Sequence, residues 1–285
     1  MSRISETDLI LNKDGTVYHL NLKPEHLSDT IITVGDPSRV HSVSRHFDEV
    51  DFEMNKREFI THVGHYKGKR VTVISTGMGT DNIEIFFTEL DALANINLET
   101  RKVNPEHRKL NIIRIGTSGA MQEHIPLDSH LVSDYAVGLD TLMCFYNLHQ
   151  DDFEQRIASG IQESTGLDFK PYIAQGSRLL KEQLAKDMRV GNTVTCPGFY
   201  APQGRKLRLE LKHPHLLDDL NCFHNEDFWL TNFEMETAGY YALAKLLGHE
   251  MLSMNAIIAN RITNKFSENV NKVVDDLILK VLNNL

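Results

Sequence analysis

The chain has 285 residues, of which 41% are hydrophobic and 24% are charged, and its formal net charge at pH 7 is −9. This is the composition of a globular protein that can bury a large core without disulfides or structural metals. The negative charge argues against nucleic acid and against an anionic membrane as partners. It leaves a small anionic substrate open, because a local site can oppose the overall charge.

The cysteines and the N-terminus bear on the compartment. Cys144, Cys196 and Cys222 are an odd number without paired spacing, which is typical of reduced thiols rather than of a disulfide framework or a zinc site. The N-terminal segment lacks the apolar core of a signal peptide, and no apolar run approaches the roughly 18 residues of a membrane span. We therefore expect a cytoplasmic protein with no membrane-spanning helix.

Short apolar runs alternate with segments of helical periodicity along most of the chain, after a polar stretch over residues 1–28 that is predicted to be an N-terminal surface arm. Strands are predicted at 30–34, 58–66, 70–75, 111–115, 130–137, 172–175, 189–196 and 251–259. Helices are predicted at 37–47, 83–96, 150–165, 177–186, 205–212 and 232–247, with a last helix capped by Ser267. The charged stretch 97–109 is predicted to be an exposed connection or an extended helix end. This alternation predicts one domain over residues 1–285, an α/β protein with a three-layer α/β/α architecture and a central mixed sheet.

Glycine-rich turns follow four of the predicted strands, at Gly35, at Gly77 and Gly79, at Gly116 and Gly119, and at Pro197-Gly198. In open α/β sheets such turns present a ligand site at the carboxyl edge of the strands. None of the four is a Walker A loop, since no Gly-Lys-Ser/Thr follows, and none is a convincing dinucleotide fingerprint. The turns therefore disfavour ATP and NAD as ligands.

An arginine interrupts the most apolar of these strands. Arg114 lies within NIIRIGTSGA, directly before a loop expected at 116–119, and Arg39 follows another of the glycine turns. Guanidinium groups beside glycine N–H groups and hydroxyls form a good cradle for free phosphate. The alternative is that each arginine makes a structural ion pair, and the pattern alone leaves both interpretations open.

Two further groups of polar residues are candidates for binding a nucleoside. Glu234 and Glu236 open a largely apolar helix, where a carboxylate can either complement the helix dipole or accept hydrogen bonds from vicinal hydroxyls such as those of ribose. Gln203 and Arg205 lie two residues apart in a loop after a strand and could read the edge of an amide-like heterocycle, on which Phe199 could stack.

Six motifs then occur together in one order: GDPSR at 35–39, KREF at 56–59, STGMGT at 75–80, RIGTSGA at 114–120, FEMETAG at 233–239 and NRIT at 260–263. With these motifs the chain resembles the nucleoside phosphorylase-I family, and most closely its uridine phosphorylase branch, over residues 18–285. The resemblance implies phosphorolysis of a nucleoside to a free base and ribose 1-phosphate, in a homodimer or a larger homo-oligomer with shared active sites, in which the arm 1–28 contributes to the subunit interface.

The resemblance also implies a role for each matching residue. Phosphate would be held by Gly35, Arg39, Arg57, Arg114 and Thr117, with Arg57 donated by a neighbouring subunit. The ribose would be held by His19 of a neighbouring subunit and by Glu234, Met235 and Glu236. The base would be held by Phe199, Gln203, Arg205, Ile258, Ala259 and Arg261, and Arg114, Glu236 and Arg205 would carry the catalysis. No cofactor or metal is implied apart from inorganic phosphate as co-substrate; a potassium ion held in some relatives by a Glu and a Ser is disfavoured here, since Glu58 is present but Asn82 replaces the serine.

The branch prediction depends on the base-binding positions. Purine-specific relatives place an Asp after the last strand, whereas this chain has Asn260-Arg261 and also has the Gln203/Arg205 pair, which suits a pyrimidine. The expected activity is the reversible phosphorolysis of uridine and 2′-deoxyuridine. The alternatives are a broad-specificity or purine nucleoside phosphorylase, a nucleosidase that uses water, and a non-catalytic nucleoside-binding protein; a nucleosidase is disfavoured because all three phosphate arginines are present.

Overall fold

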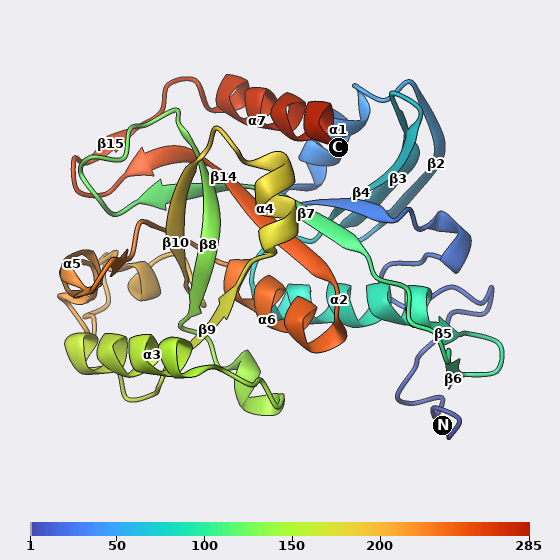
Figure 1. The fold of residues 1–285 in the computed structure, drawn as a ribbon, viewed down its shortest axis with the longest axis horizontal. Helices are drawn as coiled ribbons and strands as arrows, with labels where there is room; N and C mark the ends of the chain where they lie inside the picture. Colours follow the sequence, from blue (N-terminus) through green and yellow to red (C-terminus); the bar gives the residue numbers. More distant parts are fainter. Residues whose placement is uncertain (1) are drawn as a thin grey trace.

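The computed structural model describes residues 2–285 and contains one large mixed sheet with helices on both faces (Figure 1). The sheet has eleven strands: β1 (Thr30–Val34), β2 (Glu49–Lys56), β3 (Phe59–Tyr66), β4 (Lys69–Ser75), β7 (Asn111–Ala120), β8 (His130–Gly138), β9 (Tyr172–Gln175), β10 (Arg189–Thr195), β13 (Asn232–Glu234), β14 (Glu250–Asn260) and β15 (Lys265–Phe266). Their order is β15-β14-β8-β10-β13-β7-β1-β4-β3-β2, with β9 beside β8. Two small hairpins lie outside the sheet, β5 (Ile96–Asn97) with β6 (Lys102–Val103), and β11 (His224–Asn225) with β12 (Phe228–Trp229).

The sheet closes on itself around β7. This strand pairs in parallel with β1 and β14, while its last residues pair antiparallel with β13. Since β14 also pairs with β8, and β8 leads through β10 back to β13, five strands form a closed barrel: β7, β14, β8, β10 and β13. The strands β1 to β4 extend from this barrel as an open, twisted sheet.

Seven helices cover the sheet: α1 (Pro37–Ser44), α2 (Thr80–Asn95), α3 (Asp152–Thr165), α4 (Arg178–Leu184), α5 (Leu216–Cys222), α6 (Thr237–Leu247) and α7 (Val270–Asn284). One core lies between the sheet and α2 with α6, and it includes the fully buried Phe86, Phe87 and Tyr240. A second core lies on the opposite face, under α1, α4 and α7, and a third is formed by α3 and α5 against the barrel. The predicted three-layer α/β/α class is confirmed, and Figure 1 shows α7 and α2 on opposite sides of the strands.

Most predicted elements are present, and their local signals explain where they begin and end. Asp36 accepts a hydrogen bond from the Ser38 N–H at the start of α1, as its N-cap position requires. Gly248 ends α6 in the left-handed conformation at φ 80°, which favours glycine. The β3–β4 hairpin turns at Lys67 and Gly68, which both have positive φ.

Several predictions of local structure were wrong. Residues 116–119 are not a loop, because β7 continues to Ala120 and its last residues pair with β13 and β14. Residues 232–234 form β13 rather than the start of a helix, and 205–212 contain no helix. Ser267 does not cap α7; its hydroxyl accepts from the Asn269 N–H before the helix begins. The stretch 97–109 is the predicted exposed connection rather than a helix end: it contains no buried residue and carries most of the β5–β6 hairpin. Neither β2 nor α5 was predicted.

The second half of the N-terminal segment is not a surface arm. Val17, Leu20 and Leu22 are fully buried in the core beside α2, and Leu27 is nearly so. Their burial gives residues 17–27 a structural role within the same chain. The contribution of the segment to a subunit interface stays a prediction. Within residues 2–285, no helix is both long and apolar enough to cross a membrane.

Candidate active site

A cavity of about 650 Å³ opens where the carboxyl ends of β1, β4, β7 and β14 meet. Three of the predicted glycine turns contribute to its wall, at Gly35, Gly77 and Gly119. Twelve of the predicted site residues line it: Gly35, Arg39, Arg114, Thr117, Phe199, Gln203, Arg205, Glu234, Met235, Glu236, Ile258 and Ala259. The pairing of β1 with β7 and the closure of the barrel therefore bring together residues that are more than 200 positions apart in the sequence.

Arg114 is the buried cation of this cavity, with a side chain only 5% exposed. Its Nη2 donates to Oε2 of Glu236 at 2.6 Å and lies 3.2 Å from Oε2 of Glu234. Its Nη1 donates to Oδ1 of Asn255 at 3.0 Å. Burial alone would lower the pKa of Arg114, but the two carboxylates outweigh it, so the pKa is raised and the guanidinium stays charged.

The two glutamates differ in what their carboxylates contact. Glu234 accepts from the N–H groups of Glu236 and Thr237 at 3.0 and 2.9 Å and from two threonine hydroxyls, so its carboxylate holds the start of α6. Glu236 accepts only from Arg114 and from the Gly79 N–H at 2.9 Å within residues 2–285. Glu236 therefore keeps more free acceptor capacity toward the cavity than Glu234, which fits the predicted ribose contact.

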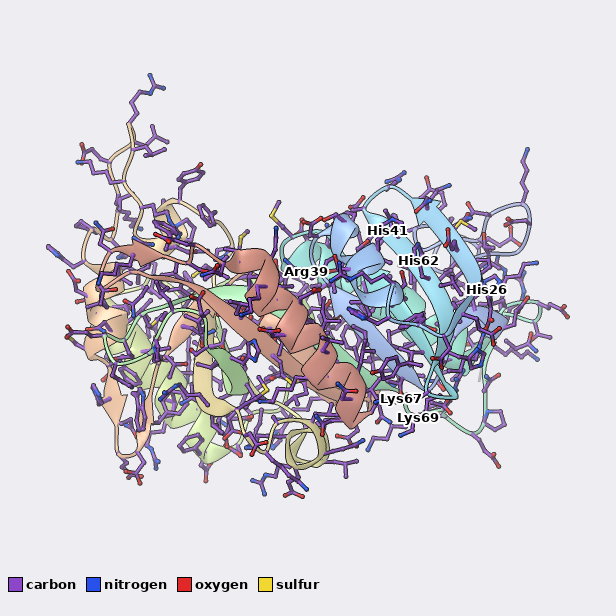
Figure 2. The ribbon with its side chains drawn as sticks, turned by 90° about the horizontal axis from the view of Figure 1, so that it is seen from above. His26, Arg39, His41, His62, Lys67 and Lys69 are labelled. Atoms are coloured by element: carbon purple, nitrogen blue, oxygen red, sulfur yellow. The ribbon has the colours of Figure 1, made fainter. Side chains whose placement is uncertain are left out.

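A second arginine reaches the same end of the cavity from α1. Arg39, labelled in Figure 2, is half-buried and donates from Nη1 to the Ile115 carbonyl at 3.3 Å. Burial, and then the positive charge of Arg114, lower the pKa of Arg39. Two guanidinium groups that repel each other beside Gly35 and Thr117 favour an anion between them.

The loop after β10 places the predicted base-reading pair on another part of the cavity wall. Nη1 of Arg205 donates to Oε1 of Gln203 at 2.5 Å and to the Phe199 carbonyl at 2.6 Å, and its guanidinium lies 3.8 Å from the centre of the Phe199 ring. Nη1 of Arg261 donates to the Gln203 carbonyl at 3.0 Å, so Arg261 supports the pair from behind without lining the cavity. Burial, and then Arg261, lower the pKa of Arg205. The Oε1 of Gln203 is engaged by Arg205, which leaves its Nε2 to face a ligand.

Asn260 follows Ile258 and Ala259 of the apolar cavity wall, but it does not face the cavity. The side chain of Asn260 donates to the Gln122 and Ile125 carbonyls and accepts from the backbone N–H groups of Ile262 and Thr263. All of its hydrogen-bonding groups are used to hold the chain after β14. Asn260 is therefore in no position to act as an acid toward a base.

The chain matches a known family over most of its length. The family model of the phosphorylase superfamily matches residues 29–282. The chain belongs to the phosphorylase superfamily. It is 30% identical over 260 residues to the uridine phosphorylase of Thermococcus kodakarensis, covering 90% of this chain and 82% of that protein. It is 28% identical over 253 residues to the DeoD-type purine nucleoside phosphorylase of Alkaliphilus metalliredigens, covering 86% of this chain and 88% of that one.

A solved structure extends the similarity to three dimensions. The chain aligns with a Trypanosoma brucei nucleoside phosphorylase described as showing uridine phosphorylase activity, with a TM-score of 0.88, 29% identity and coverage of 98% and 100% of the two chains. The predicted family is thereby confirmed, and this phosphorylase is a pentosyltransferase of the nucleoside phosphorylase kind. Its relatives include both a uridine phosphorylase and a purine nucleoside phosphorylase.

Besides Arg261, two predicted site residues of this phosphorylase lie outside the cavity, and they lie close to each other. Nδ1 of His19 is 2.7 Å from Oε1 of Glu89, in a separate hollow under the N-terminal segment. Arg57 is exposed, has a positive φ of 54°, and lies 5.9 Å from the ring centre of Tyr18. Neither reaches the cavity of its own chain, so their roles in a neighbouring subunit's site stay predictions.

Nine residues that line the cavity were not among the predicted site residues, and neither was Asn255, which contacts Arg114. Met78 and Phe266 line the cavity although they are 73% and 70% exposed, so they form part of its rim. Asn255 binds Arg114 from within the barrel. The only signal for Asn255 in the sequence is an amide within an apolar strand, the same kind of signal that singled out Arg114.

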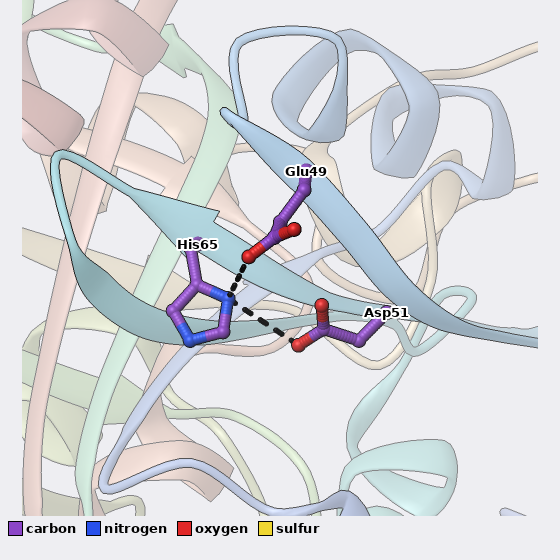
Figure 3. A group of neighbouring side chains, drawn as sticks. All are labelled: Glu49, Asp51 and His65. Carbon is purple, nitrogen blue, oxygen red and sulfur yellow. Dashed lines mark ion pairs between the residues drawn. The ribbon is translucent and has the colours of Figure 1, made fainter.

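One group of side chains within residues 2–285 could hold a metal ion, and it lies away from the cavity. Glu49 and Asp51 of β2 each place a carboxylate oxygen 3.3 Å from Nδ1 of His65 on β3 (Figure 3). All three side chains are at least 31% exposed, and their contacts with one another account for the arrangement.

Proposed function

We propose that the protein is a uridine phosphorylase, which reversibly converts uridine or 2′-deoxyuridine and inorganic phosphate into uracil and the corresponding sugar 1-phosphate. The observation that carries the proposal is that one cavity is lined by both the Arg114–Glu236 ion pair and the Gln203–Arg205 pair. The first pair suits a phosphate next to a sugar, and the second suits the edge of a pyrimidine.

The base end complements uracil in particular. Uracil presents two carbonyls that flank an N–H group, so it needs donor, acceptor and donor groups opposite it. Nε2 of Gln203 can donate, its Oε1 can accept a second hydrogen bond besides that from Arg205, and the Arg205 guanidinium can donate. Cytosine places an amino group where uracil has a carbonyl, and it would meet the donors of Arg205 unfavourably.

The phosphate end supports the reaction by electrostatics. Arg114 and Arg39, completed by Arg57 of a neighbouring subunit, would hold phosphate below the anomeric carbon, while Glu236 accepts from the ribose hydroxyls. Breaking the glycosidic bond leaves positive charge on the sugar, which the bound phosphate stabilises and then attacks. The negative charge that develops on uracil is neutralised by Arg205. No covalent enzyme intermediate, metal or cofactor is needed in this scheme.

We further propose that the enzyme works as a homodimer or a larger homo-oligomer. His19 and Arg57 share one surface of the subunit and reach no ligand site of their own chain. They can act in catalysis only if another copy brings them to its cavity.

A purine nucleoside phosphorylase is the second candidate, since purine enzymes are among the relatives. Two observations argue against a purine substrate. Asn260 has no free group that could protonate a purine, and Gln203 and Arg205 present hydrogen-bonding groups that suit the edge of a pyrimidine.

The proposed reaction makes base release depend on phosphate. Purified protein is incubated with uridine, inosine or adenosine, each with and without phosphate, and the free bases are separated and quantified. We expect uracil from uridine only when phosphate is present. Uracil release without phosphate would indicate a nucleosidase and contradict phosphorolysis, whereas faster release from inosine than from uridine would contradict the pyrimidine assignment.

A further inference from the structure

The barrel next to the cavity has a polar interior. Each of its five strands contributes a buried side chain that can form hydrogen bonds, and four of these side chains are fully buried while Ser118 is 5% exposed. They come from β7, β13, β10, β8 and β14 in the order in which these strands close the barrel, and they are Ser118, Asn232, Thr193, Ser133 and Asn255. A small barrel is usually filled with apolar side chains, so this chain of polar groups needs a reason.

The hydrogen bonds run continuously around the barrel from Ser118 to Arg114, and both of these residues line the cavity. Nδ2 of Asn232 donates to Ser118 at 2.9 Å, and its Oδ1 accepts from Thr193 at 3.0 Å. The hydroxyls of Thr193 and Ser133 are 2.6 Å apart, and Nδ2 of Asn255 donates to Ser133 at 3.4 Å. The series then reaches Arg114 through Oδ1 of Asn255.

The donor and the acceptor of each hydrogen bond in this series follow from the number of hydroxyl protons that are available. Thr193 has a single hydroxyl proton, which it donates to Asn232. Ser133 must therefore donate its own proton to Thr193, and it can only accept from Asn255. The amide of Asn255 is thus oriented with its N–H₂ group toward Ser133 and its oxygen toward Arg114.

The space for the Arg114 side chain is provided by a glycine. A Cβ atom on residue 116 would lie 1.9 Å from Nη1 of Arg114 and 2.9 Å from Oδ1 of Asn255. The φ of Gly116 is not in the left-handed region, so its conformation does not require glycine. The absence of a side chain is required by the close approach of the guanidinium.

We propose that Asn255 is the positioning residue of Arg114, oriented by the polar interior of the barrel and given room by Gly116. The inference rests on the proposed function, in which Arg114 holds phosphate. Glu236 fixes one guanidinium nitrogen and Asn255 fixes the other. Since Nη1 and Nη2 are both held, the plane of the guanidinium is set before any ligand binds, which lowers the cost of binding phosphate.

The proposal is tested by kinetics and by direct phosphate binding. In Asn255→Leu, which keeps the size of the side chain, we expect the KM for phosphate to rise about tenfold or more, because a hydrogen bond to a charged group is lost. The KM for uridine should change little. Asn255→Asp, which retains an oxygen toward Arg114, should keep more phosphate affinity than Asn255→Leu. Titration with inorganic phosphate in a calorimeter provides the same comparison without turnover.

Thr193→Val is a gentler variant that guards against misfolding, and Gly116→Ala tests the space for the guanidinium. Thr193→Val removes one hydroxyl that touches neither Arg114 nor the cavity lining, so that Ser133 can turn its proton toward Asn255. It should raise the phosphate KM by a few fold. Gly116→Ala should raise it more, because the methyl group displaces the guanidinium.

The matched control is Thr61→Val on β3, which replaces a fully buried hydroxyl outside the barrel that has no hydrogen-bond partner. It should leave both KM values unchanged.

Failure of the inference and failure of the proposed function give different results. If the wild-type enzyme requires phosphate and Asn255→Leu and Thr193→Val keep its phosphate KM and affinity, the positioning role is overturned while the proposed function holds. If the wild-type protein releases uracil without phosphate, the proposed function is overturned. If the variants lose thermal stability but bind phosphate like the wild type, the barrel network is structural only, which also contradicts the inference.

Discussion

Replacing Arg114 with alanine is expected to lower kcat/KM for uridine phosphorolysis by about 100- to 1,000-fold, the size of effect seen when one preorganised electrostatic donor is removed from an active site. The reason is that Arg114 contacts the Glu236 carboxylate and also lines the phosphate end of the cavity. Its loss would weaken phosphate binding and release the carboxylate that contacts the ribose.

The same change should also destabilise the fold, because it leaves buried carboxylates without their cation. The activity is therefore measured well below the melting temperature, with circular dichroism as the check that the variant is folded. Arg70→Ala is the control, since Arg70 donates to backbone carbonyls, is exposed and does not line the cavity. Near-normal turnover by folded Arg114→Ala would remove Arg114 from the phosphate site.

Replacing Arg205 with alanine is expected to lower kcat/KM for uridine by about 10- to 100-fold, which corresponds to the loss of a charge-assisted hydrogen bond in the transition state. The change removes the donor for the uracil carbonyl and the group that fixes Oε1 of Gln203. The phosphate KM should stay close to that of the wild type, because Arg205 contacts the predicted base-binding residues Gln203 and Phe199. The preference for uridine over inosine should shrink as well.

Arg208→Ala provides the control for this experiment. Arg208 lies three residues further along the same loop, is exposed and does not line the cavity. It should leave the uridine parameters unchanged. A variant at Arg205 that loses affinity for phosphate and uridine equally would indicate a collapsed loop rather than a lost base contact.

The sequence predicted those parts of the fold that depend on local patterns. Strands such as 30–34 and helices such as 150–165 carry their own hydrophobic periodicity and capping residues, so they were found close to their observed bounds. The extension of β7 through Gly116 and Gly119 was missed because it depends on pairing with β13 and β14, which lie more than 100 residues away. The same non-local pairing turned 232–234 into a strand although its composition suggested a helix start.

The candidate site divides in a similar way. Residues within short motifs, such as Arg114, Glu236 and the Gln203/Arg205 pair, were predicted and do line one cavity. Asn255 was missed because its importance comes from the barrel closing around Arg114. His19 and Arg57 could be assigned only through the family resemblance, since their contacts would lie on another subunit.

A competition between two nucleosides tests the account most directly. Uridine and inosine are mixed at equal concentration with excess phosphate in one vessel, and uracil and hypoxanthine are quantified over time together with the sugar 1-phosphates. The arrangement of Gln203 and Arg205 opposite the Arg114–Glu236 pair predicts that uracil is released first, with one ribose 1-phosphate formed for each uracil. Hypoxanthine appearing first, or uracil appearing without an equal amount of sugar phosphate, would contradict it.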